Sequence, residues 1–105
     1  MREFMEKYEF LLLPVNQVLP FDVTTRYPTE IAGVKMENYI AWMKSTYYIS
    51  IVGNPALSVP CGFTEKNLPV GLQFMARAGD DVAVIQAART YQLHTDWHRR
   101  HPRIV

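Results

Sequence analysis

Two stretches, GNPALSVPCGFT at residues 53–64 and LPVGLQ at residues 68–73, decide the fold of this chain. The glycine that opens the first stretch, followed by Pro55, ends a preceding helix, because glycine adopts the left-handed cap and proline cannot continue the helix. The apolar run at residues 56–63 then predicts a strand. After a turn, residues 70–77 predict a second strand that pairs with the first as a hairpin.

Helices are predicted on both sides of this hairpin. Downstream, Asp80 is a suitable N-cap for a helix that extends to about Leu93. One face of this helix carries Val84, Ala88 and Tyr91. Upstream, apolar residues at helical spacing predict a helix over residues 36–50. These apolar residues are Tyr39, Ile40, Met43, Tyr47 and Ile51.

The N-terminal third of the chain is less regular. Residues 2–8 show the pattern of a short amphipathic helix. Residues 9–15 contain a continuous apolar run that predicts a short buried strand. Residues 16–34 contain prolines and no periodicity, so we expect an ordered surface loop there. The predicted order is helix, strand, loop, helix, strand, strand, helix, which is an α/β fold in one segment, residues 1–105.

Composition narrows the class of protein. The chain has 105 residues, 49% of them hydrophobic, and a net charge of +1. Because positive and negative charges nearly cancel, the net charge gives no support to a nucleic-acid partner or to binding at a membrane surface. The single Cys61 cannot form an intramolecular disulfide, and we therefore expect a cytoplasmic protein.

The histidines offer a possible metal site. His94, His98 and His101 would share one face if the last helix continued through them. The segment is rich in arginine, however, and Pro102 prevents a long extension. A cationic surface at the end of a helix is the better interpretation, so we expect no metal.

Neither nucleophiles nor cofactor motifs are evident. Cys61 lies in an apolar strand, where a thiol is usually a small buried side chain rather than a nucleophile. Ser58 has no surrounding Gly-x-Ser-x-Gly elbow. The glycines form neither a phosphate-binding loop nor a dinucleotide fingerprint, so no nucleotide cofactor is expected.

The two stretches quoted first resemble the C-terminal part of the amidase signature family. Upstream, Pro20–Asp22, Tyr27–Gly33 and Tyr39–Met43 resemble the same region of a subgroup of these amidases. The resemblance covers essentially the whole chain. It implies the C-terminal part of a large α/β/α sandwich with a mixed sheet.

The resemblance also implies a chemistry whose catalytic residues are not in this chain. Members of the family hydrolyse carbon–nitrogen amide bonds with a serine nucleophile, a second serine in a cis peptide and a lysine base, and without a metal. The serines here are Ser45, Ser50 and Ser58, and no two are adjacent. No catalytic residue can therefore be carried over. The residues expected to face a substrate channel are Gly53, Asn54, Pro55 and Ser58, with the loop at residues 16–33.

We therefore expect the C-terminal portion of an amidase-like hydrolase, inactive alone. Its partner would be the missing amidase core, and a small-molecule amide would be its substrate only in the completed enzyme. The alternative is a non-catalytic binding or self-association module, because a piece of a larger fold leaves apolar faces and sheet edges uncovered.

Overall fold

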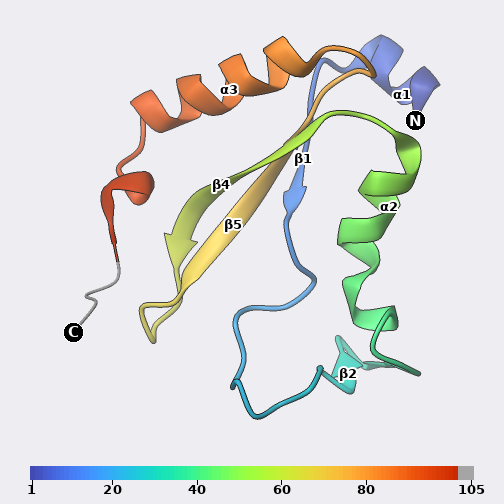
Figure 1. The fold of residues 1–105 in the computed structure, drawn as a ribbon, viewed down its shortest axis with the longest axis vertical. Coiled ribbons are helices and arrows are strands. Elements are labelled where there is room, and N and C mark those ends of the chain that lie inside the picture. Colours follow the sequence, from blue (N-terminus) through green and yellow to red (C-terminus); the bar gives the residue numbers. More distant parts are fainter. Residues whose placement is uncertain (102–105) are drawn as a thin grey trace.

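The computed structural model describes residues 1–101 as a small α/β unit (Figure 1). Two short 3-10 turns, Ala41–Met43 and Trp97–Arg99, accompany the helices and strands. The elements in chain order are α1 (Arg2–Lys7), β1 (Leu11–Pro14), β2 (Glu30–Ile31), β3 (Val34–Lys35), α2 (Lys44–Val52), β4 (Ala56–Phe63), β5 (Pro69–Met75) and α3 (Asp81–Leu93).

The main sheet has three strands in the order β1-β5-β4. The predicted β4–β5 hairpin is confirmed, and β4 has the predicted bounds. A bulge lies between Pro60 and Gly62, where the sequence interrupts the apolar run. The sequence resemblance predicted strands of a mixed sheet, whereas every strand pairing within residues 1–101 is antiparallel.

Successive side chains along each strand point to opposite faces of the sheet, and helices pack on both faces. Val59 of β4 and Phe74 of β5 pack against Val84 and Ala88 of α3. Met75, the next residue along β5, points to the opposite face. There it packs with Met5 of α1 and Ile49 of α2. The sheet therefore lies between α3 on one side and α1 with α2 on the other (Figure 1).

The termini of two helices follow the sequence closely. At the start of α3, the carboxylate of Asp80 accepts a hydrogen bond from the backbone N–H of Ala83 at 3.3 Å, which confirms the predicted cap. Gly53 ends α2 in the left-handed conformation, with φ of 71°. A residue with a Cβ atom is strained at that angle, which explains the glycine.

The start of α2 differs from the prediction. The helix begins at Lys44 rather than at residue 36. The side-chain oxygen of Asn38 accepts hydrogen bonds from the N–H groups of Ile40 and Ala41, which closes a turn instead of a helix. Of the apolar residues that set the predicted spacing, Ile51 is 74% exposed, whereas Ile49, which is not among them, is buried.

Two N-terminal elements also differ from the prediction. The segment predicted to be a loop contains the β2–β3 hairpin. Its turn uses Ala32 and Gly33, both with positive φ, as two-residue hairpins require. β1 is not buried on both sides: burial alternates along it, and Leu12 is 49% exposed. One face of this strand is therefore largely open.

The helices of residues 1–101 are all too short or too polar to cross a lipid bilayer. Pro102, which the sequence places after the last turn, lies outside the described residues.

Candidate functional site

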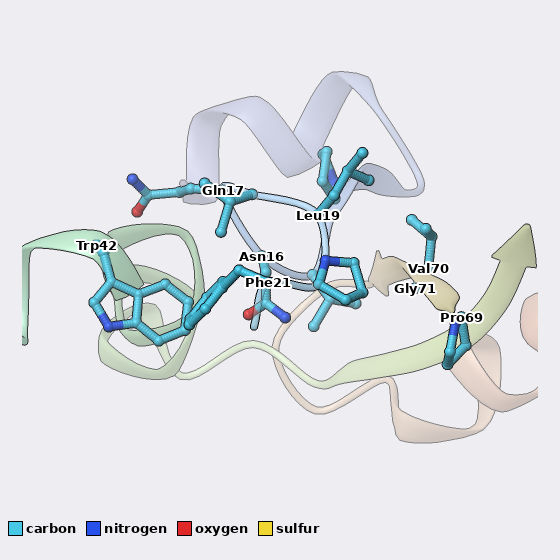
Figure 2. A pocket seen from close by; sticks show the side chains of 12 residues that line it. Asn16, Gln17, Leu19, Phe21, Trp42, Pro69, Val70 and Gly71 are labelled. Carbon is cyan, nitrogen blue, oxygen red and sulfur yellow. The ribbon is translucent and has the colours of Figure 1, made fainter. Parts of the chain in front are cut away.

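A hollow of about 480 Å³ lies where the chain leaves β1 and passes the start of β5. Trp42 and Phe21 stand on one side of it and Pro69–Gly71 on the other, with the Asn16 side chain between them (Figure 2). We call it the loop hollow. Its lining residues are Pro14, Val15, Asn16, Gln17, Val18, Leu19, Pro20, Phe21, Trp42, Pro69, Val70 and Gly71.

Hydrogen bonds connect the loop residues Val15 and Gln17, which line the loop hollow, to α2 and to β5. Ser45, in the first turn of α2, donates its backbone N–H to the Gln17 side-chain oxygen at 3.1 Å. The Ser45 hydroxyl donates to the Val15 carbonyl at 3.4 Å. Val15 in turn donates its N–H to the carbonyl of Gly71 in β5 at 3.2 Å. These bonds hold the entrance of the loop between α2 and β5.

Aromatic rings pack together on the side of the loop hollow that faces Pro69–Gly71. Phe21 meets Trp42 edge to face, with ring centroids 5.6 Å apart, and Tyr39 meets Trp42 in the same way at 6.1 Å. Such edge-to-face pairs are favourable beyond the area they bury. Beside them, the hydroxyl and N–H of Thr24 donate to the Asp22 carboxylate and lower its pKa.

Ser58 lies next to the loop hollow. With Val15, Asn16 and Gly71 it lines a smaller adjoining depression. Gln73 is its cross-strand partner on β5, so both side chains point to the same face of the sheet. The side-chain oxygen of Gln73 is buried and has no hydrogen-bond partner within the described residues. Polar groups therefore gather where the loop meets the β4–β5 hairpin.

The other three channel candidates, Gly53, Asn54 and Pro55, lie just before β4, whereas Ser58 is the third residue of the strand. At the usual rise of a strand they are roughly 10–17 Å from Ser58 along the chain. The Asn54 amide donates to the Ala76 carbonyl at 2.7 Å, and the Pro55 carbonyl accepts from the Ala76 N–H at 3.1 Å. The structure thus brings Ser58, but not these three residues, to the loop at residues 16–33.

Replacing Asn54 with alanine should therefore reduce stability. The half-buried Asn54 amide satisfies the carbonyl of Ala76, a residue that is only 1% exposed. We expect Asn54→Ala to lower the free energy of unfolding by about 1–2 kcal/mol, because a buried acceptor loses its partner. Urea denaturation followed by circular dichroism measures this loss. Ser50→Ala, which removes an exposed hydroxyl on α2, is the control, and equal effects of the two changes would contradict a bracing role for Asn54.

The remaining reactive side chains do not converge on the loop hollow. Cys61 lies at the bulge of β4 and is half-buried. Burial, and then the nearby Cys61, raise the pKa of Tyr91 on α3. His94 follows the end of α3 and contacts the carbonyl of Thr90, while His98 lies in the next 3-10 turn. Within residues 1–101, no three His, Cys, Asp or Glu side chains form a metal-binding group.

Sequence reasoning did not find the β5 wall of the loop hollow. The local pattern places Pro69 in a turn and Val70 at the start of a strand, and it predicts no contact of either residue with the loop. These residues meet the loop because β1 pairs with β5, which places Pro14 opposite Leu72. The sequence marks both segments only by their prolines, Pro14 and Pro69, and prolines do not specify which strands pair.

Comparison with known proteins identifies the family. The family model described as Amidase matches residues 1–85. A glutamyl-tRNA(Gln) amidotransferase subunit from Thermodesulfovibrio yellowstonii is 34% identical over 100 residues, which cover 92% of this chain and 19% of the relative. The corresponding subunit of Moorella thermoacetica is 36% identical over 99 residues, with coverages of 94% and 19%.

A solved structure agrees with these relatives. It is described as the crystal structure of an amidase, and it superposes with a TM-score of 0.73 and 26% sequence identity. The match covers 86% of this chain and 20% of the solved one. This chain therefore spans about a fifth of the length of the proteins it matches. The family model, the relatives and the solved structure agree, and the chain therefore belongs to the amidase family.

Proposed function

We propose that residues 1–105 are the C-terminal segment of an amidase-type hydrolase, which cleaves a carbon–nitrogen amide bond with water to give an acid and an amine. The observation that carries this proposal is the family match over residues 1–85 combined with the small share of each relative that the chain spans. The chemistry depends on a serine pair and a lysine that this segment lacks. We therefore propose that it is inactive alone and becomes part of an active site only when an amidase core completes it.

The two open sheet edges support assembly with such a core. Both β1 and β4 have one neighbouring strand in the described sheet, which is β5. Unpaired strand edges readily accept further strands. We propose that the sheet continues in the completed enzyme as an α/β/α sandwich with a mixed sheet. The lone, unpaired Cys61 fits a reducing, cytoplasmic setting for that enzyme.

Complementation tests this proposal. The Moorella thermoacetica subunit, shortened by the segment that matches this chain, supplies a core to be co-expressed with the full 105-residue chain. We expect no hydrolysis of simple amides by the chain alone, and hydrolysis above either part when the two are combined. Turnover by the chain alone that Ser58→Ala or Cys61→Ala abolishes would overturn the proposal, and so would a combined sample with no gain.

Self-association is a second candidate, because α2 carries an uncovered apolar surface. Tyr48 is 54% exposed, Ile51 74% and Val52 40%. A large exposed apolar patch favours association with another chain. Light scattering coupled to size exclusion should then give a dimer or larger species that Ile51→Lys converts to monomer. A strictly monomeric folded chain at micromolar concentration would contradict this candidate.

A further inference from the structure

A second cavity, of about 530 Å³, lies near the end of β5 that is away from the loop hollow. It is bordered by α1, by the last turn of α2 and by the turn that joins β5 to α3 (Figure 1). We call it the helix cavity. Its volume lies within the range of roughly 300–1,000 Å³ that is typical of ligand pockets. The residues that line it include Arg2, Met5, Glu6, Val52 and Arg77.

Two arginines supply positive charge to the helix cavity. The Nε of Arg77 donates to the Met5 carbonyl at 2.7 Å, which fixes this side chain against α1. A guanidinium has further N–H donors, and these remain for another acceptor. Neither Arg2 nor Arg77 forms an ion pair within residues 1–101. Because a guanidinium binds a carboxylate through paired hydrogen bonds, the two arginines favour a ligand that carries a carboxylate.

The helix cavity also has a negative side. Glu6 lies one helical turn after Arg2 on α1. Val52 is the last residue of α2, where the helix dipole is negative and the last carbonyl groups have no helical partner. Glu9 and Asp80 also lie near Arg77, but they line a separate, smaller depression. A simple anion would be repelled by Glu6 and by this helix end, whereas a ligand that also carries an ammonium group would be attracted to both.

Apolar surface lies between the charged groups. Met5 is only 3% exposed, and Val52, which also lines the helix cavity, is 40% exposed. Methionine is flexible and adapts to differently shaped apolar groups. An apolar side chain of a ligand would leave water by packing here, which favours binding.

We propose that the helix cavity binds a free α-amino acid with an apolar side chain. The carboxylate binds Arg2 and Arg77. The ammonium group binds Glu6 and the C-terminal end of α2, and the side chain packs on Met5 and Val52. This site is additional to the proposed amide hydrolysis and does not depend on it. Because the ligand contacts α1, α2 and the turn after β5 together, its binding should also stabilise the fold.

Nuclear magnetic resonance of the full 105-residue chain tests the proposal with leucine as the probe. The chain has five methionines, and Met5→Leu assigns the methyl signal of Met5 in a ¹H–¹³C spectrum. Met36 follows β3, does not line the helix cavity and is the internal control. Leucine should shift the Met5 signal saturably, leave the Met36 signal unchanged and raise the urea midpoint.

Two derivatives of leucine test the need for both charges. N-acetylleucine has no ammonium group, and leucinamide has no carboxylate. Each should bind about tenfold more weakly than leucine, the effect of losing one charge-assisted contact. An unshifted Met5 signal with leucine, or either derivative binding as tightly as leucine, would overturn the proposal.

Charge-removing variants assign the two ends of the ligand. Arg2→Gln should weaken the binding of leucine by about three- to tenfold, as expected for a partly exposed ion pair. Glu6→Gln should weaken leucine binding by a similar factor without weakening the binding of N-acetylleucine. Arg89→Gln and Glu65→Gln make the same charge changes at exposed positions outside the helix cavity and should have no effect. Normal leucine binding by Arg2→Gln or by Glu6→Gln would contradict the proposed contacts.

Discussion

Met75→Ala should lower the free energy of unfolding by about 2–5 kcal/mol, the range for truncating a large buried side chain to alanine. Met75 has no exposed surface, and it packs with Met5 of α1 and Ile49 of α2. It also pairs with Leu11 and Ala56 on both neighbouring strands. Removing its side chain leaves a cavity between the sheet and both helices. Since small domains have only about 5–15 kcal/mol of stability, the loss should be visible as a large shift of the urea midpoint.

Ile51→Ala is the control for this change. Ile51 lies on α2, as Ile49 does, but is 74% exposed. Its truncation removes few contacts, so the free energy of unfolding should change by less than about 0.5 kcal/mol. Equal losses in the two variants would show that α2 does not cover this face of the sheet in solution. Such a result would contradict the two-sided packing described above.

The sequence predicted the β4–β5 hairpin and α3 well because their signals are local. Gly53 and Pro55 stop one helix, and Asp80 caps the next, each through its own backbone chemistry. Within α3, the burial of Val84 and Ala88 follows directly from helical spacing. For these elements, nothing distant in the chain overrides the local preference.

The elements that differ from the prediction depend on contacts with distant parts of the chain or on competing side-chain bonds. Helical spacing extended α2 back to residue 36, but the side chain of Asn38 forms a turn there instead. Periodicity identified an apolar stripe that includes Ile51, yet it does not say what covers the stripe. In β1, a continuous apolar run predicted burial on both faces, whereas one face of the strand is largely open.

The candidate site was predictable only in part for the same reason. The sequence analysis predicted one channel site for Gly53, Asn54, Pro55 and Ser58 because they are close together in the same motif. Along an extended strand such neighbours lie far apart, and alternate residues point to opposite faces. The loop at residues 16–33 meets Ser58 through the pairing of β1 with β5, a register that turn chemistry does not fix.

Gly71→Ala tests that register at its tightest point. A Cβ atom at position 71 would lie 2.8 Å from Cγ2 of Val15 and 3.1 Å from the hydroxyl oxygen of Ser58. Val15 has little freedom to retreat, because its N–H is bonded to the Gly71 carbonyl itself. We expect a loss of about 1–3 kcal/mol in the free energy of unfolding, the usual cost of overpacking, and a larger loss for Gly71→Val. Gly62→Ala is the control, since its Cβ would meet no atom within 4 Å.

The contact with Val15 can be isolated by removing the opposing methyl groups. Val15→Ala eliminates Cγ2, so Gly71→Ala should cost less in that background, with a coupling of about 0.5–3 kcal/mol for side chains in direct contact. Additive effects in the double variant would mean that the loop does not approach β5 as closely as the structure shows. A coupling between the two changes would instead show that this one contact helps to fix the register of β1 on β5.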